Sequence, residues 1–462
     1  MRYIDSRGDN FAKFDFEHVL LGGLTSNAGL YVPEEFPVLS STELASLKEL
    51  DYQALAVRIL SMFTGDTFTK EELQGIISKA YSKFDCQDIA PLTKLKHGLY
   101  MLNLYHGPTL AFKDYAMQVL SGMFEVVLKR SNKRSTIIAA TSGDTGSAAI
   151  EAFKDNSTMN VLVLYPNGHV SEVQRRQMTT VISQNVRNIA LEGSFDDCQN
   201  IVKDIFSDTE FKSAHNLSAV NSINWARIAI QIVYYFYAGL QLDADEKKVS
   251  FCVPTGNFGN IFAAYAAKQM GLKIENLIIA TNTNNILKRF IDSGIMQKEK
   301  VLPSLSPSMD IQISSNFERL LFFSYGRDTA SLKKLMHDFK TIGKYSVNAD
   351  ALKYIKETFL AFEADNAVTL QTIKNAYQEF NVLIDPHTAV GLHAAFQYKS
   401  NIPLVTLSTA HPSKFADTAH KATGVMPKLP SFLADLFERK EAYTVLPNST
   451  DAVKAFIVNE GF

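Results

Sequence analysis

Short apolar runs that alternate with amphipathic stretches are the feature that most constrains the fold of this chain. We expect strands over 137–140, 161–165, 249–253, 277–280 and 404–407. Helical patterns follow most of them, over 145–154, 171–183, 196–207, 225–241, 260–270 and 386–398. Strands that alternate with helices in this way are typical of βαβ units and of a mostly parallel sheet. The sequence therefore predicts an α/β fold.

Two parts of the chain lack this alternation. The first 95 residues have helical patterns over 41–63 and 70–84 and little strand signal. Residues 300–375 also lose the strand pattern, and 332–362 has a helical one, so we expect a helical insertion packed beside the sheet. We accordingly divide the chain into an α-rich domain, 1–95; an α/β domain, 96–220; a second α/β domain with the insertion, 221–430; and a tail, 431–462.

The charge balance argues against several classes of function. The 462 residues include 46 Lys and Arg and 48 Asp and Glu, whereas a general nucleic-acid binder would need a basic excess. The chain has no apolar run of membrane-spanning length and no signal-peptide pattern at its start. Its three cysteines lie far apart, and neither they nor the histidines have zinc-site spacing. We therefore expect a cytoplasmic protein without a metal site and without nucleic-acid or membrane partners.

Two glycine-rich turns follow predicted strands, at the sheet edge where parallel α/β proteins bind ligands. Residues 141–149, TSGDTGSAA, open a helix whose start would favour an anion. Ordinary helix capping by Asp144 or Thr145 explains this segment equally well. Residues 254–260, PTGNFGN, place two glycines beside two asparagines, which favours an anion site over a tight turn with an asparagine cap.

A lysine in the segment 105–115 is a candidate nucleophile. Lys113 lies beside the apolar residues 110–112 at the start of a predicted helix. Burial would lower its pKa and make the amine nucleophilic, as a Schiff-base lysine requires. A lysine whose ammonium group reaches solvent is an equally good interpretation of this segment alone.

Two further segments carry polar side chains whose role stays open at this point. Thr409 follows the predicted strand 404–407, although capping of the next helix is the simpler interpretation. Asn221, Ser222 and Arg227 would present donors to one anion if a helix begins near residue 222 or 224. The alternative is a helix cap followed by a surface arginine that stacks on the neighbouring tryptophan.

Together these segments suit pyridoxal phosphate, which needs a Schiff-base lysine, a phosphate cup and a partner for its ring nitrogen. In these segments the chain resembles the threonine synthase family, which belongs to the fold type II pyridoxal-phosphate enzymes (tryptophan synthase β-like). The resemblance implies mostly parallel sheets wrapped by helices. It covers most of the chain, and its motifs follow the family order: GGLTSNAGLYVPEEFP at 22–37, HGPTLAFKD at 106–114, ATSGDTG at 140–146, EGSFDDCQ at 192–199, NSIN at 221–224, PTGNFGN at 254–260 and TAHPSKF at 409–415. The combination is specific, although no single motif is.

The resemblance implies a role for each motif residue. Lys113 would bind the cofactor covalently, and Thr409 would meet its pyridine nitrogen. The cofactor phosphate would lie against Gly256, Asn257, Phe258, Gly259 and Asn260. The substrate carboxylate would bind Ser142 and Thr145, and the substrate phosphate would bind Asn221, Ser222 and Arg227. Asp144 would lie along the cofactor O3′; relatives often carry Asn there, and an ionised Asp would repel a phenolate-like oxygen.

The activity implied by the resemblance is the conversion of O-phospho-L-homoserine and water to L-threonine and phosphate, the last step of threonine biosynthesis. A related phospho-lyase or dehydratase that releases 2-oxobutyrate shares the early steps and fits the same motifs. A cysteine-synthase-like enzyme would not need the 221–227 segment, and a non-catalytic binder of phosphorylated ligands would not need Lys113. Either a monomer or a homodimer is compatible with the sequence.

Overall fold

The computed structural model describes residues 1–8, 12–219 and 221–462. It divides into two compact units, each assembled from separate parts of the chain. The first unit comprises Met1–Ser78, Phe84–His106 and Ser222–Pro427, and the second comprises Lys79–Lys83, Gly107–Asn221 and Lys428–Phe462. The four-part division drawn from the sequence stays a prediction, and its boundary residue 220 lies outside the described residues.

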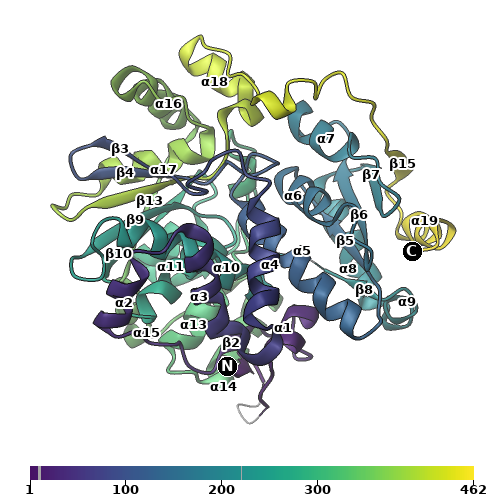
Figure 1. Ribbon diagram of the computed structural model, residues 1–462, viewed down its shortest axis with the longest axis horizontal. Coiled ribbons are helices and arrows are strands. Elements are labelled where there is room, and N and C mark those ends of the chain that lie inside the picture. Colours follow the sequence, from purple (N-terminus) through teal and green to yellow (C-terminus); the bar gives the residue numbers. More distant parts are fainter. Residues whose placement is uncertain (9–11, 220) are drawn as a thin grey trace. The chain divides into compact units, whose positions relative to one another are not determined.

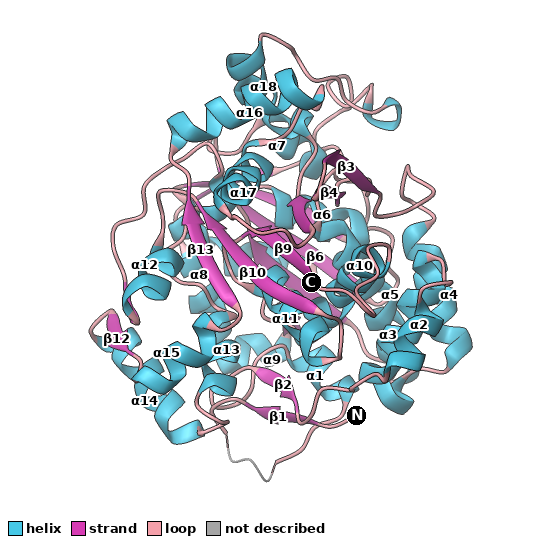
Figure 2. Ribbon diagram, turned by 90° about the vertical axis from the view of Figure 1, so that its left-hand side faces the viewer, coloured by secondary structure: helices cyan, strands magenta, loops and turns pink. Residues whose placement is uncertain are grey.

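A sheet with the strand order β13-β10-β9-β14-β4-β3 forms the centre of the first unit. Neighbouring strands run parallel except for β3 and β4. Figure 2 shows β13, β10 and β9 side by side. The central strands β9 and β14 are buried along their whole length and mostly apolar, as is typical of a parallel sheet with helices on both faces. The strands are β3 (Leu92–Lys96), β4 (Leu99–Asn103), β9 (Val249–Pro254), β10 (Ile274–Thr281), β13 (Phe359–Glu363) and β14 (Leu404–Ser408).

Helices and two small two-stranded sheets complete the first unit. Helix α17 packs on β9, β10 and β14, and apolar residues of α16 and α17 join those strands in one buried cluster. The two-stranded sheets pair β1 with β2 and β11 with β12, both antiparallel. The elements are β1 (Tyr3–Asp5), α1 (Phe16–Gly22), β2 (Tyr31–Pro33), α2 (Ser41–Leu47), α3 (Tyr52–Thr64), η1 (Gly65–Thr67), α4 (Lys70–Tyr81), α10 (Trp225–Leu240), α11 (Gly259–Gln269), α12 (Ile286–Ser293), β11 (Ile295–Gln297), η2 (Pro307–Met309), α13 (Phe317–Ser324), α14 (Thr329–Thr341), β12 (Lys344–Ser346), α15 (Ala349–Lys356), α16 (Asn366–Phe380), α17 (Pro386–Gln397), η3 (Pro412–Phe415) and α18 (Ala416–Thr423).

The second unit is built on a parallel sheet with the order β15-β7-β6-β5-β8. Apolar residues of α8 and α19 pack against β5, β6 and β7, which lie together in Figure 1. The elements are α5 (Lys113–Arg130), β5 (Ser135–Ala140), α6 (Asp144–Phe153), β6 (Met159–Pro166), α7 (Glu172–Thr179), β7 (Val186–Glu192), α8 (Phe195–Ser207), α9 (Thr209–Ala214), β8 (Leu217–Ser218), η4 (Ser431–Leu433), β15 (Thr444–Pro447) and α19 (Thr450–Glu460). Across the described ranges, no helix combines the length and the apolar character needed to cross a membrane.

The structure confirms the predicted α/β fold with mostly parallel sheets, and it corrects two details. The helix expected over 41–63 is two helices, because the Asp51 side chain caps α3 by accepting a hydrogen bond from the Ala54 N–H. The segment 300–375 is not free of strands, and 332–362 is not continuously helical. It contains β12 and also β13, which pairs with β10 at the edge of the larger sheet.

Candidate active site

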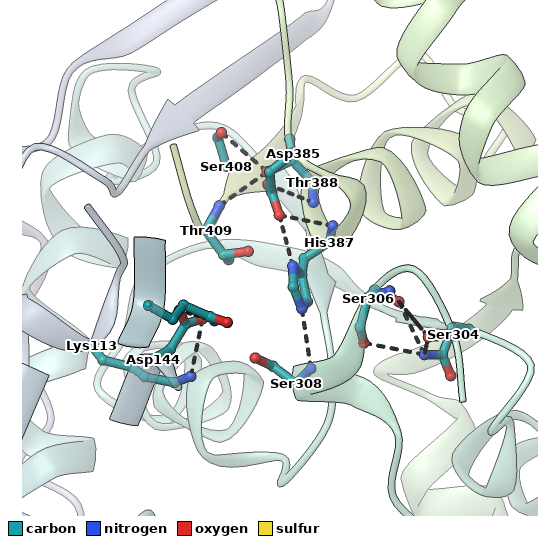
Figure 3. Close-up of polar contacts among 12 residues, drawn as sticks. Lys113, Asp144, Ser304, Ser306, Ser308, Asp385, His387, Thr388, Ser408 and Thr409 are labelled. Atoms are coloured by element: carbon teal, nitrogen blue, oxygen red, sulfur yellow. Dashed lines mark hydrogen bonds and ion pairs between the residues drawn. The ribbon is translucent and has the colours of Figure 1, made fainter. Parts of the chain in front are cut away.

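Lys113 and Asp144 form an ion pair in the second unit. Lys113 is the first residue of α5, and Asp144 is the first residue of α6. The Lys113 Nζ lies 3.4 Å from the Asp144 Oδ2, and both side chains are largely buried (Figure 3). This arrangement rules out the interpretation of Lys113 as a lysine whose ammonium group simply reaches solvent. Lys113 thus places an amine at the start of a helix, next to the Asp144 carboxylate.

The turn before Lys113 is held rigidly. Asp114 is fully buried, and its carboxylate accepts hydrogen bonds from the N–H and the hydroxyl of Thr109, at 2.8 and 2.6 Å. A Cβ on Gly107 would lie 2.4 Å from the Asp114 Cβ, so this close approach requires glycine. Leu110 has a left-handed backbone conformation, with φ of 62°. The chain therefore fixes where α5 starts, and with it the origin of the Lys113 side chain.

The turn between β5 and α6 is not capped by the side chains that the sequence suggested. Neither Asp144 nor Thr145 caps the helix: the N-cap residue is Gly143, and the Thr141 hydroxyl accepts hydrogen bonds from the N–H groups of Gly143 and Gly146. Ser142 and Thr145 are half-buried. The interpretation of Asp144 or Thr145 as the helix cap is therefore wrong.

Asp144 has a second partner that the sequence did not identify. The Gln174 Nε2 donates to the Asp144 Oδ1 at 2.9 Å, and the Gln174 Oε1 accepts from the Ser171 N–H. Gln174 lies in α7, in a capping box with Ser171. That spacing was visible in the sequence, but it signals a helix start and says nothing of a contact with Asp144.

In the first unit, the loop from Gly256 to Asn260 connects β9 to α11. Phe258 is left-handed, with φ of 64°, and within the described residues no side chain caps α11. The first N–H groups of a helix without a cap are ready donors for an anion. The alternative interpretation, a tight turn with an Asn cap, is therefore wrong, and the anion site stays the favoured prediction.

Neighbouring segments hold this loop from behind. The Ser314 hydroxyl donates to the Gly256 carbonyl at 2.7 Å. The Asn316 Nδ2 donates both to the Asn257 carbonyl, at 2.8 Å, and to the Ser222 carbonyl, at 3.0 Å. The Ser222 backbone therefore lies beside the loop, and its predicted role at the substrate phosphate stays a prediction. Ser314 and Asn316 lie in a segment without any recognisable motif, so the sequence did not identify them.

Asn260 is fixed by two tyrosines of α10. The hydroxyls of Tyr234 and Tyr235 both donate to the Asn260 Oδ1, at 2.5 and 2.7 Å. The Asn260 Nδ2 is buried and has no hydrogen-bond partner anywhere in 1–8, 12–219 or 221–462. A buried donor without a partner is costly, so this amide is suited to a ligand acceptor.

Arg227 is a buried guanidinium group, and no ion pair joins it to a carboxylate within 1–8, 12–219 and 221–462. It lies in α10, whose N-cap is Asn224, and it is 3% exposed. Its Nε and Nη1 have no hydrogen-bond partner among the residues that the structure describes. Burial lowers the pKa of Arg227 to about 10, with a smaller opposing effect from Tyr234. The surface arginine stacked on Trp225 is therefore excluded; the cation over that ring is Arg319.

Thr409 follows β14 and is buried. Its N–H donates to the Thr388 Oγ1 at 3.2 Å (Figure 3), so it does not cap the next helical turn. His411 has that role, since its Nδ1 accepts from the Ser413 N–H. Thr388 belongs to a buried hydrogen-bond network with Asp385 and His387. The sequence did not predict this network, because Asp followed by Pro at a helix start indicates only an ordinary N-cap.

The predicted residues are divided between the two units. Lys113, Asp144 and their turn lie in the second unit, together with Asn221. Ser222, Arg227, Thr409 and the loop 256–260 lie in the first. The first unit offers a helix start without a cap, a buried amide donor and a buried guanidinium group that lack partners among the described residues. These donors fit a group that carries phosphate. In the second unit, Lys113 supplies the kind of amine that forms a Schiff base with a carbonyl group.

The comparisons with known proteins point to one family. Family models match residues 2–81 (Threonine synthase N terminus), 78–328 (Pyridoxal-phosphate dependent enzyme) and 388–457 (Threonine synthase, C-terminal). A threonine synthase from Pseudomonas aeruginosa is 47% identical, and the alignment covers 100% of this chain and 99% of that protein.

Solved structures agree with this result. A pyridoxal-phosphate-bound threonine synthase from Brucella melitensis superposes with a TM-score of 0.97 at 46% identity, over 100% of this chain and 99% of that one. A threonine synthase from yeast superposes with a TM-score of 0.94 at 38% identity, over 99% and 98%.

Proposed function

The chain belongs to the threonine synthase family, and we propose that it converts O-phospho-L-homoserine and water to L-threonine and phosphate with pyridoxal phosphate as cofactor. The observation that carries the substrate assignment is Arg227. A buried guanidinium group with two donors unpartnered among the described residues needs an anion, and planar N–H pairs suit phosphate. Because the start of α11 already supplies donors for a cofactor phosphate, Arg227 is left for a phosphate on the substrate.

Lys113 is proposed as the catalytic residue. Bound pyridoxal phosphate supplies an electron sink that acidifies the C–H bonds next to the substrate amine. Lys113 would hold the cofactor covalently until the substrate amine takes its place. The freed amine would then remove the Cα proton and later return it. The rigid turn around Thr109 and Asp114 supports this role, since it fixes the origin of the side chain.

The remaining residues are proposed to bind and orient. Gly256, Asn257, Phe258, Gly259 and Asn260 would hold the cofactor phosphate, and Thr409 would meet the pyridine nitrogen. A hydroxyl there does not force protonation of that nitrogen, as an aspartate would. Ser142 and Thr145 would bind the substrate carboxylate, with Asp144 beside the cofactor O3′. Asn221 and Ser222 would join Arg227 in holding the phosphate that leaves.

A phospho-lyase that releases 2-oxobutyrate is the competing proposal. Both reactions expel phosphate, and they differ in whether water adds at Cβ before the intermediate escapes. The full-length similarity to threonine synthases favours the synthase. We also propose a cytoplasmic location and a monomer or homodimer. Light scattering of the purified protein would decide between the two assemblies.

Product analysis tests the proposed function directly. The protein, loaded with pyridoxal phosphate, is incubated with O-phospho-L-homoserine while phosphate, threonine and 2-oxobutyrate are followed together. Threonine formed one for one with phosphate supports the synthase. Phosphate with 2-oxobutyrate identifies a phospho-lyase instead. If cofactor-loaded protein releases neither product, the substrate assignment is wrong.

A further inference from the structure

We propose that Asp385 and His387 form a positioning pair that orients both ends of the proposed cofactor cup in the first unit, at Thr409 and at Gly256. The proposal rests on the proposed function, because that function assigns the cup to Thr409 and to the loop 256–260. Neither residue of the pair is proposed to touch the substrate. Figure 3 shows the pair between Thr409 and Ser308.

The Asp385 carboxylate accepts more hydrogen bonds than a helix cap requires. It is fully buried at the N-cap of α17. One oxygen, Oδ1, accepts from the N–H of Thr388 at 3.0 Å and from the Thr388 hydroxyl. The other, Oδ2, accepts from the His387 N–H at 2.9 Å and lies 2.7 Å from the His387 Nδ1. The backbone bonds suffice for a cap, so the two side-chain contacts require a separate explanation.

The first side-chain contact fixes the tautomer of His387. The Ser308 N–H donates to the His387 Nε2 at 3.2 Å, so that nitrogen is the acceptor. In a neutral imidazole the other nitrogen then carries the proton. The Nδ1–H therefore donates to Asp385, and the carboxylate keeps His387 in the one form that can accept from Ser308.

The Ser308 backbone also contacts the loop 256–260. Its carbonyl oxygen lies 2.8 Å from the position that a Cβ would have on Gly256. The loop 256–260 therefore rests directly on the Ser308 backbone. A shift of Ser308 would move Gly256, which is the first residue of the proposed phosphate cup.

The second side-chain contact acts at the other end of the cup. Because the Thr388 hydroxyl gives its proton to Asp385, it can only accept from its other neighbours. It accepts the Thr409 N–H at 3.2 Å and, by the same logic, the Ser408 hydroxyl proton at 3.1 Å. One carboxylate therefore makes the His387 Nε2 and the Thr388 hydroxyl the acceptors of the N–H groups of Ser308 and Thr409.

The decisive variant is Asp385→Asn, which keeps the shape and changes the donor pattern. Either orientation of the amide places an NH₂ group against a backbone N–H that Asp385 now accepts. With the NH₂ toward His387, the ring would accept at Nδ1 and carry its proton on Nε2, facing the Ser308 N–H. With the NH₂ toward Thr388, the hydrogen bond that orients Thr409 would be altered.

Two readouts besides activity follow the variant in the full-length chain labelled with [15N]histidine. The wild-type ring of His387 should show a protonated Nδ1 and a bare Nε2, and Asp385→Asn should change that pattern. The dissociation constant of pyridoxal phosphate, titrated by absorbance, should rise about 10- to 100-fold, as for partners that orient metal ligands. The 31P signal of the bound cofactor should shift in the same variant.

A histidine series keeps the proposal testable if Asp385→Asn does not fold. His387→Gln retains an acceptor for the Ser308 N–H, whereas His387→Phe does not. Cofactor affinity should fall in the order wild type, His387→Gln, His387→Phe. The matched control is His393→Gln, which alters the same helix at a half-buried position outside the network and should leave affinity unchanged.

The outcomes separate this proposal from the proposed function. An unchanged tautomer and unchanged cofactor affinity in Asp385→Asn would reduce the pair to a helix cap and overturn the proposal. Equal affinity of His387→Gln and His387→Phe would do the same. If the wild type binds cofactor but makes no threonine while the variants still lose affinity, the positioning role stands and the substrate assignment falls. If the wild type does not bind pyridoxal phosphate, both fall.

Discussion

Nε2 of Gln174 donates a 2.9 Å hydrogen bond to Oδ1 of Asp144, the residue at which α6 begins. The two side chains are buried, and a Cβ on Gly143 would lie 2.5 Å from the Gln174 Cδ. Gln174 thus holds the carboxylate at one oxygen while the Lys113 Nζ lies 3.4 Å from the other.

Gln174→Glu should loosen the Asp144 turn. The substitution replaces a donor by a second buried carboxylate and leaves Asp144 facing a like charge. We expect a loss of roughly 1–3 kcal/mol in the free energy of unfolding and weaker cofactor binding. Chemical denaturation and absorbance titration measure the two effects. Gln184→Glu, at an exposed position, is the control, and equal effects of both variants would show that the Asp144 contact is unimportant.

Lys113→Ala should abolish covalent attachment of the cofactor and formation of threonine. The visible absorbance of the attached cofactor and its retention after denaturation and reduction report the loss. Lys129→Ala, at the last turn of the same helix, should behave as the wild type. Normal turnover by Lys113→Ala would refute the assignment of the catalytic residue.

Gly256→Ala should impair the phosphate loop by steric overlap. The added methyl group would lie 2.8 Å from the Ser308 carbonyl oxygen, which is backbone and cannot rotate away. We expect a cost of about 1–3 kcal/mol and reduced cofactor affinity. In contrast, Gly75→Ala places its methyl group in open space in α4 and should stabilise the protein by up to about 1 kcal/mol. Similar melting temperatures for the two variants would contradict this prediction.

Arg227→Met should weaken substrate binding without lowering the free energy of unfolding of the ligand-free protein. Removing a buried charge that lacks an anion should leave the ligand-free protein as stable or more stable, by about 1 kcal/mol or more. Affinity for O-phospho-L-homoserine should fall by about 30-fold or more, because a buried charged contact is worth at least about 2 kcal/mol. Cofactor affinity should change far less. Equal loss of both affinities would place Arg227 at the cofactor instead. Arg439→Met, near the surface, is the control.

His411 should contribute an acid-labile part of the stability. Burial lowers the pKa of His411 to about 4 in the folded chain. Between about pH 4 and the ordinary value near 6.5, the unfolded chain binds a proton that the folded chain does not. The free energy of unfolding should therefore fall as the pH drops from about 6.5 to about 4, by about 2 kcal/mol after allowance for partial exposure.

The variant His411→Asn isolates this contribution. Asparagine can still accept the Ser413 N–H that His411 accepts now, but it does not titrate. Denaturation curves from pH 4 to pH 7 should show a weaker pH dependence than the wild type. His420→Asn, at an exposed position, should leave the slope unchanged. Identical slopes for wild type and His411→Asn would contradict the prediction.

Local sequence patterns predicted the strands and turns that carry the candidate site, because each pattern lies within a few residues. The β9 strand and its glycine turn are one example. The same reasoning missed β13, whose five residues follow a helical stretch and gain strand character only by pairing with β10, far away in the sequence.

Burial and long-range hydrogen bonds limited the prediction of the site itself. The apolar pattern around Arg227 suggested an amphipathic helix with one face in solvent. In the structure, α10 is buried on nearly all sides, so the Arg227 guanidinium group is not exposed to solvent. Asp385 and His387 look like a helix start, and their contacts to Ser308 and Thr409 join segments that no spacing rule connects.

Strand β15 pairs with β7 although roughly 250 residues separate them in the chain. At typical rates of synthesis, the β7 edge waits on the order of 10–50 s on the ribosome before its partner exists. During that time the N–H and C=O groups along the free edge of β7 have no partner strand, and such an edge can pair with strands of other chains. Production of this protein should therefore depend on chaperones that shield nascent edges, and truncation before β15 should yield aggregates.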